Sequence, residues 1–114
     1  MARCIFCEIV RRERPARIVY EDETTVAFED SHPQAPTHLL VIPREHISGL
    51  DQARAEDEAL VGHLQRVAAR LAAERNIHRT GYRTVLNVGP NAGQSIFHLH
   101  LHLLGGRPLR WPPG

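Results

Sequence analysis

Histidine and leucine alternate without a break from His98 to Leu103. A period of two predicts a β-strand, because successive side chains of a strand point to opposite faces of the sheet. We expect this strand to span residues 96–104. Three imidazoles would then share one face and three leucines would face the core, namely His98, His100 and His102 against Leu99, Leu101 and Leu103.

The remaining elements predict an α+β fold. Four further strand-like segments cover residues 17–20, 24–28, 38–42 and 82–88, joined by short turns. Apolar residues at three- and four-residue steps predict one long helix over residues 54–75, and residues 4–10 form a short helical turn. Five antiparallel strands with one covering helix make an α+β sheet, and we expect one chain to cover a single face of it. The 114 residues suit one domain, 1–114.

Charge and hydropathy exclude two classes of partner. Fourteen basic and thirteen acidic residues leave a net charge of +1 with no basic block, which disfavours nucleic-acid binding by phosphate neutralisation. No apolar run is long enough for a membrane span, and the first residues do not resemble a signal peptide. We therefore expect a cytoplasmic protein that does not bind membranes.

The clustered histidines allow three interpretations. They could form a solvated strand face that happens to be rich in histidine, or a metal site. The third interpretation is catalysis, because neighbouring imidazoles oppose one another's protonation. One ring then stays neutral and nucleophilic at neutral pH while another supplies a proton, and attack on phosphorus would give a covalent histidine intermediate.

The loop before the histidines suits a phosphate group. Gly93, Gln94 and Ser95 offer backbone N–H groups and a hydroxyl immediately ahead of the predicted strand. The loop lacks the Gly-Lys-Ser/Thr of a Walker sequence, so ATPase chemistry of that type is not supported.

These motifs together resemble those of the histidine-triad (HIT) superfamily. The stretch 98–104 is similar to its signature, and the segments 33–38, 93–95, 104–107 and 111–114 are similar to the Hint branch of purine nucleoside phosphoramidases. The resemblance runs in order from Ile5 to Gly114. It implies a five-stranded antiparallel sheet with one long helix and a short N-terminal helix, and a homodimer in which two sheets become continuous.

The resemblance also implies roles for individual residues. His100 would be the nucleophile on the α-phosphorus, His102 and Ser95 would lie at the phosphate and the leaving amine, and His98 and His38 would support the triad. Asp30 would bind the ribose, although the spacing alone favours an Asx turn at this proline loop. The purine would lie against Ile5, Phe6, Ile9 and Phe28, and the phosphate side would include Asn87, Gly93 and Gln94. Ser31 stands where the branch usually has an aliphatic residue, which weakens apolar contact with the nucleoside.

Cys4 and Cys7 are open to more than one explanation. They could be a redox pair, two free thiols or part of a zinc site. Bacterial Hint-like proteins, which this chain resembles in its N-terminal pair, bind a structural zinc through positions that correspond to Cys4, Cys7, His46 and His98. We expect zinc there and no organic cofactor.

The implied activity is hydrolysis of purine nucleoside 5′-phosphoramidates, or of conjugates similar to aminoacyl-adenylates, to a nucleoside monophosphate and an amine. Two alternatives are a dinucleoside polyphosphate hydrolase and a nucleotide-binding regulatory or scaffold dimer with residual activity. In the homodimer that the resemblance implies, Trp111 would approach the partner's site.

Overall fold

The computed structural model describes residues 3–114; Met1 and Ala2 of the predicted domain lie outside the described residues. Two α-helices and five strands follow one another as α1 (Ile5–Val10), β1 (Ile18–Glu21), β2 (Thr25–Glu29), β3 (Thr37–Pro43), α2 (Glu58–Glu74), β4 (Tyr82–Leu86) and β5 (Leu101–Gly105). The strands form one antiparallel sheet in the order β1-β2-β3-β5-β4. The predicted α+β architecture is therefore confirmed.

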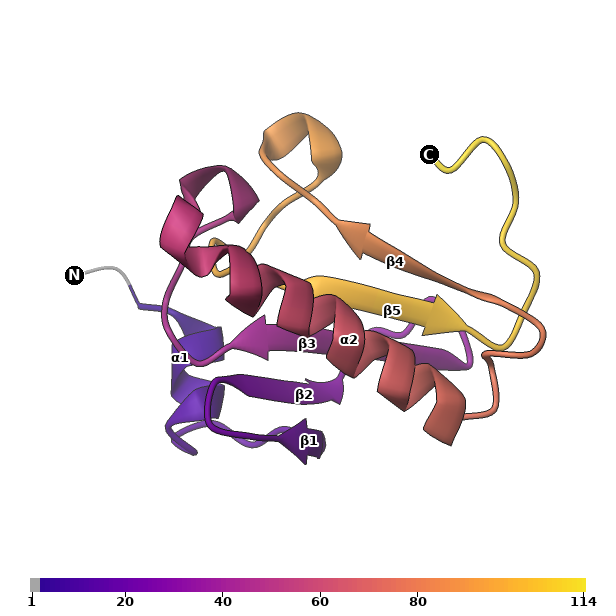
Figure 1. Ribbon diagram of the computed structural model, residues 1–114, viewed down its shortest axis with the longest axis horizontal. Coiled ribbons are helices and arrows are strands. Elements are labelled where there is room, and N and C mark those ends of the chain that lie inside the picture. The colour runs from indigo at the N-terminus through magenta and orange to yellow at the C-terminus, as the bar shows by residue number, and fades with distance from the viewer. Residues whose placement is uncertain (1–2) are drawn as a thin grey trace.

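The long helix covers one face of this sheet (Figure 1). The predicted helix over residues 54–75 consists of a 3-10 turn at Ala55–Asp57 followed by α2. Its buried stripe packs on alternate residues of the central strands, and the leucines of the histidine segment lie in the same core: Leu64, Val67, Ala68 and Leu71 against Leu39, Val41, Leu99, Leu101 and Leu103. The predicted inward direction of the leucines is thus confirmed.

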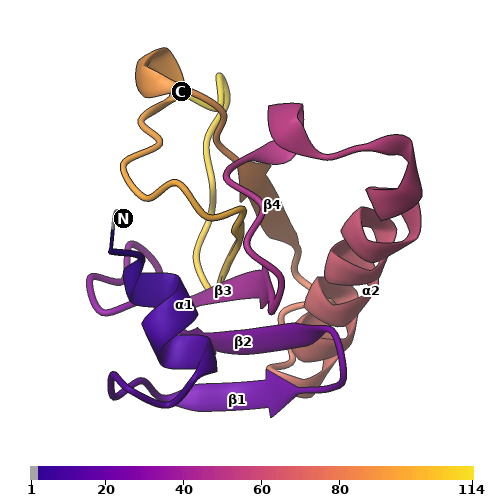
Figure 2. The same cartoon turned by 90° about the vertical axis from the view of Figure 1, so that its left-hand side faces the viewer.

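The opposite face carries α1 (Figure 2). Phe6 and Ile9 pack on the residues of β2 and β3 that point away from α2, including Phe28 and Leu40. The expectation that one chain covers a single sheet face is therefore wrong, because the short N-terminal helix supplies a second apolar layer. The histidines lie on this side of the sheet, since Leu40 of β3 is paired with His102 of β5.

Strand β5 is shorter than the predicted strand 96–104. Pairing of β3 with β5 ends at Val41 and Leu101, and residues 96–100 are irregular, with bends at Ile96 and His98. Proline has no N–H to donate to the ladder, and Pro43 stands where the next bonded pair with residue 99 would form. The N–H of Leu99 donates to the carbonyl of Ile47 instead, at 2.6 Å. His98 and His100 consequently precede the strand, and only His102 lies on it.

Asp22 ties the β1–β2 hairpin to α2. Its carboxylate accepts hydrogen bonds from the N–H groups of Thr24 and Thr25 and from the hydroxyl of Tyr20 at 2.6 Å. Nε2 of His63, on α2, lies 2.7 Å from the same carboxylate. Burial alone raises the pKa of Asp22, but these hydrogen bonds outweigh burial and hold that pKa well below its usual range. None of the described helices is long and apolar enough to cross a membrane.

Candidate active site and metal cluster

A backbone N–H fixes which nitrogen of His38 is protonated, and His38 in turn fixes the protonated nitrogen of His102. The N–H of Gln34 donates to Nδ1 of His38 at 3.0 Å, so a neutral His38 carries its proton on Nε2. That Nε2 lies 2.9 Å from Nδ1 of His102, which must accept. His102 in turn carries its proton on Nε2, which has no hydrogen-bond partner among residues 3–114.

His100 has the opposite tautomer. Its Nδ1 lies 2.7 Å from the carbonyl oxygen of His98, and a carbonyl can only accept. The proton of His100 is therefore on Nδ1, and Nε2 keeps its lone pair. Nε2 of His100 has no hydrogen-bond partner among the described residues. Every buried side-chain nitrogen or oxygen in those residues does have such a partner. Nε2 must therefore be reachable from solvent, although His100 as a whole is buried.

The three interacting rings are thus His38, His102 and His100, with ring centroids 5.2 Å apart for the first pair and 5.0 Å for the second. Burial lowers the pKa of His38. Burial, together with the positive charge that His100 and His38 can carry, lowers the pKa of His102 to about 4. His102 is therefore neutral at pH 7.

Asp30 belongs to this group as well. Its Oδ2 lies 3.3 Å from Nε2 of His38, and its Oδ1 accepts from the N–H of His32 in an Asx turn. Asp30, His38 and His102 lie close enough to hold a metal ion. The Gln34 N–H excludes that use in the observed arrangement, because it keeps the proton on the Nε2 that a metal would need. The group is a chain of hydrogen bonds.

The predicted phosphate loop follows a 3-10 turn at Pro90–Ala92. Gly93 has a φ of +85°, which favours glycine, and nothing lies within 4 Å of the position a Cβ would take, so its face is open. Ser95 is exposed, and Asn87 is half-buried just beyond β4. Gln94 differs from these residues, because its buried side-chain amide bonds to the backbone of Gly89, Ser48 and Ile96. Its side chain shapes the loop, and its backbone N–H donates to the carbonyl of Gly89 at 3.1 Å.

The residues predicted to contact the purine lie together on the α1 side of the sheet. Phe6, Ile9 and Phe28 are buried in one cluster, with Ile5 half-buried beside them. The ring of Phe6 meets the ring of Phe28 edge-on at 5.4 Å and the ring of His100 at 5.2 Å. Phe6 therefore joins the apolar cluster to the histidines. Ser31 is exposed and bonds to its neighbour His32.

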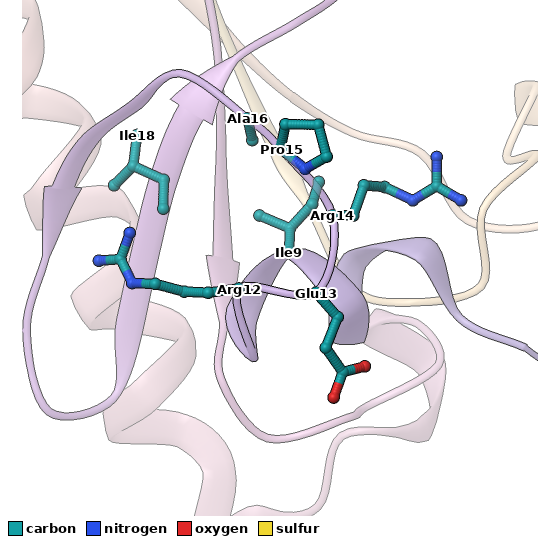
Figure 3. A pocket seen from close by; sticks show the side chains of 7 residues that line it. All are labelled: Ile9, Arg12, Glu13, Arg14, Pro15, Ala16 and Ile18. Carbon is teal, nitrogen blue, oxygen red and sulfur yellow. The ribbon is translucent and has the colours of Figure 1, made fainter.

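A pocket of about 330 Å³ lies at the edge of this apolar cluster (Figure 3). Ile9 and Ile18 line it together with the turn of residues 12–16. None of the histidines of the site lines this pocket. The apolar cluster thus contacts the histidines through Phe6, and an open cavity lies beside Ile9.

The remaining predicted triad member, His98, faces the cysteines. Its Nδ1 lies 3.4 Å from Sγ of Cys4 and 3.6 Å from Sγ of Cys7, and Nδ1 of His46 lies 3.3 Å from Sγ of Cys7. One potential ligand atom from each of these residues lies within 4.8 Å of the others. We call this group the Cys/His cluster. In a tetrahedral zinc site, a sulfur and a nitrogen ligand are separated by about 3.5 Å, so the observed distances fit the edges of such a site.

The protonation of the Cys/His cluster also fits a metal. Nε2 of His98 donates to the carbonyl of Pro43 at 2.8 Å, which leaves the lone pair of Nδ1 directed at the sulfurs. Burial is the main cause that lowers the pKa of His98 to about 4, so the ring is neutral, as a ligand must be. Burial and the adjacent Cys4 raise the pKa of Cys7 to about 11. A bound cation would counter that effect and favour the thiolate.

Sequence reasoning did not single out the groups that orient these rings. They are the N–H of Gln34 and the carbonyls of Pro43 and His98. Backbone groups carry no residue-type signal, so only the two prolines that stiffen the loop before His38 hinted at one of them.

The C-terminal segment runs beside β4. The guanidinium of Arg83 donates to the carbonyls of Leu109 and Arg110 at 3.4 and 3.0 Å. Trp111 follows and is 81% exposed. This tryptophan is thus available to a neighbouring molecule.

Comparisons with known proteins agree with this geometry. Residues 3–108 match the family model described as "Scavenger mRNA decapping enzyme C-term binding". An uncharacterized HIT-like protein of Synechococcus elongatus is 56% identical over 110 residues, which is 96% of each chain. A 14 kDa zinc-binding protein of Zea mays is 46% identical over 112 residues, covering 96% of this chain and 87% of that protein.

Solved structures show the same likeness. A HIT family hydrolase of Legionella pneumophila superposes with a TM-score of 0.96 at 46% identity, over 98% of this chain and all of that one. A histidine triad protein of Clostridium difficile gives a TM-score of 0.91 at 39% identity, over 96% and 97% of the two chains. The Cys/His cluster has the ligands to hold a metal, and the chain belongs to the histidine-triad superfamily.

Proposed function

We propose that this protein hydrolyses purine nucleoside 5′-phosphoramidates or conjugates similar to aminoacyl-adenylates. The products are a nucleoside monophosphate and an amine. Membership of a superfamily with hydrolases of the same fold supports a nucleotide hydrolase in general. The choice of a phosphoramidate rests on the resemblance of residues 93–95 and 111–114 to the Hint branch.

The observation that carries the proposal is the tautomer of His100. Its Nδ1 is bound to the His98 carbonyl, and its Nε2 holds a lone pair that solvent can reach. Nε2 attacks the α-phosphorus, the P–N bond breaks, and the amine leaves with a proton. Water then attacks the nucleotidyl-histidine, which releases the nucleoside monophosphate and restores the imidazole.

His102 and Ser95 serve the phosphate and the leaving group. The Nε2–H of His102, which has no partner among the described residues, donates to the leaving nitrogen, and the water that attacks in the second step restores that proton. The exposed hydroxyl of Ser95 donates to the same region. Asp30 serves the ribose hydroxyls, and the apolar cluster of Phe6, Ile9 and Phe28 supports the purine.

The Cys/His cluster holds zinc in this proposal. Cys4, Cys7, His46 and His98 provide two sulfur and two nitrogen ligands, and no place is needed for water. A closed site of this kind stabilises structure. The protein also works as a cytoplasmic homodimer with Trp111 near the neighbouring site.

Parallel rates on two substrates test the proposal. Adenosine 5′-phosphoramidate should be hydrolysed much faster than a diadenosine polyphosphate by the zinc-loaded protein. The opposite preference would favour a dinucleoside polyphosphate hydrolase. Binding of AMP without turnover of either substrate would favour a regulatory or scaffold protein. The His100→Gly variant is the control, because loss of the nucleophile should lower the rate by several orders of magnitude and leave AMP binding in place.

A further inference from the structure

We propose that the Cys/His cluster positions the nucleophile, so that metal binding controls turnover as well as stability. The inference rests on the proposed function, because it concerns the orientation of His100 for attack. It follows from three physical connections between the cluster and His100.

The first connection is His98 itself. Its imidazole is a member of the Cys/His cluster, while its carbonyl accepts the Nδ1 proton of His100. His98 is completely buried, and its Nε2 is held by the carbonyl of Pro43. A ring fixed at both nitrogens restricts the backbone of the same residue. The carbonyl that selects the tautomer of His100 is therefore fixed by the residue that would bind the metal.

The second connection passes through Ile47. This residue follows the potential ligand His46, and its carbonyl accepts the N–H of Leu99 at 2.6 Å. Leu99 lies between His98 and His100 in the segment that precedes β5 and has no ladder bonds. The position of the backbone that leads into His100 thus depends on the bond between Leu99 and Ile47. These two residues follow the cluster members His98 and His46.

The third connection is Phe6, which lies between the two cysteines on α1. Its ring meets the rings of His98 and His100 edge-on at 6.0 and 5.2 Å. α1 has only six residues, too few for a helix to be stable without tertiary contacts. A metal that joins Cys4 and Cys7 to His98 would hold α1, and with it Phe6, against the nucleophile.

Loss of the metal should therefore disturb the orientation of the His100 ring. The Cys/His cluster would lose its common centre, and the His98 carbonyl and Phe6 would both gain freedom. A misplacement of about 1 Å at a reacting group costs about 100-fold in rate. We expect kcat to fall by about 10- to 100-fold in metal-free protein. AMP affinity should fall as well, because Phe6 and Ile9 lie on α1, but part of it should remain, because Phe28 and Asp30 are held by the sheet and its adjoining loop.

The experiment compares protein loaded with Zn²⁺ and the same protein after chelation. Phosphoramidate kcat is one readout. The second is the nitrogen NMR spectrum of the His100 ring, which reports the tautomer without any turnover. Zinc-loaded protein should show one tautomer, with the proton on Nδ1. Metal-free protein should show mixed tautomers and a lower kcat, and added Zn²⁺ should restore both.

Two variants separate positioning from stability. His46→Ala removes an exposed ligand without opening a cavity, so the fold should persist while zinc binding weakens. It supplies the metal-poor state if chelated wild-type protein unfolds. Asp22→Asn weakens the hairpin clamp and leaves the Cys/His cluster untouched, so it should lower stability and keep both kcat and the tautomer.

Unchanged kcat and an unchanged His100 spectrum in folded, metal-poor protein would overturn the inference. The proposed function has a separate failure, which is that zinc-loaded wild-type protein does not hydrolyse phosphoramidates. In that case the NMR comparison still decides whether the Cys/His cluster orients His100.

Discussion

Replacing Asp22 by asparagine should destabilise the protein by weakening the clamp between the β1–β2 hairpin and α2. The amide side chain keeps one carbonyl oxygen for the N–H groups of Thr24 and Thr25 but loses the carboxylate oxygen that serves Tyr20 and His63. Hydrogen bonds to a charged group contribute about 1.5–3 kcal/mol each when well shielded. The side chains of Asp22 and His63 are 28% and 40% exposed, so we expect a total loss of about 2 kcal/mol.

Urea unfolding followed by far-UV circular dichroism measures this loss, and the melting temperature should fall by about 8 °C. The folded-state pKa of Asp22 is lowered, so its contribution is present above the unfolded-state pKa of about 4 and disappears as the pH falls below it. The difference between wild type and variant should therefore shrink in acid. Tyr20→Phe, a matched variant that removes one of the bonds, should cost about 1 kcal/mol. Equal urea midpoints at pH 7, or a difference that persists unchanged in acid, would refute this reasoning.

Three further predictions concern the zinc site, the titration of His102 and the C-terminal residues 109–114. Purified protein should contain close to one zinc per chain, and the double variant Cys4→Ser, Cys7→Ser should lose the zinc and melt at a lower temperature; metal-free protein with two titratable thiols would count against the zinc. The His102 ring should titrate by NMR with a midpoint near pH 4. Its neutral form therefore stabilises the fold above about pH 6.5, and this contribution is lost as the pH falls towards 4. A midpoint near 6.5 would contradict the burial of His102 beside His38. Removal of residues 109–114 should leave a dimer by light scattering and change leaving-group preference more than AMP affinity; a monomeric wild-type protein, or a truncated protein with unchanged preference, would contradict the role given to Trp111.

Local patterns were sufficient to predict most of the fold. The apolar stripe of α2 and the leucines at positions 99, 101 and 103 occupy the core as their spacing predicts. The length of β5 could not be predicted from its own sequence, because its pairing stops where Pro43 of another strand lacks an N–H. The second apolar layer was missed for a similar reason. The contact of Phe6 and Ile9 with Phe28 joins elements that are distant in sequence.

The candidate site, like the fold, could be predicted only in part. The spacing of His98, His100 and His102 indicates that they lie near one another, but not that the ring of His98 faces Cys4 and Cys7. The tautomers could not be predicted at all. They depend on the N–H of Gln34 and on two carbonyl groups, and every residue type offers such groups. The buried amide of Gln94 is a third case, since its partners come from the backbone of distant turns.

The central claim is that His100 attacks phosphorus through Nε2, and rapid quenching during turnover tests it most directly. Zinc-loaded protein mixed with excess adenosine 5′-phosphoramidate should be quenched, digested and analysed by mass spectrometry. The account predicts an adenylyl group on the peptide that contains His100, stable in base and labile in acid, and none in His100→Gly. Hydrolysis by the wild type with no adduct on this peptide, or an adduct on His102 instead, would contradict it.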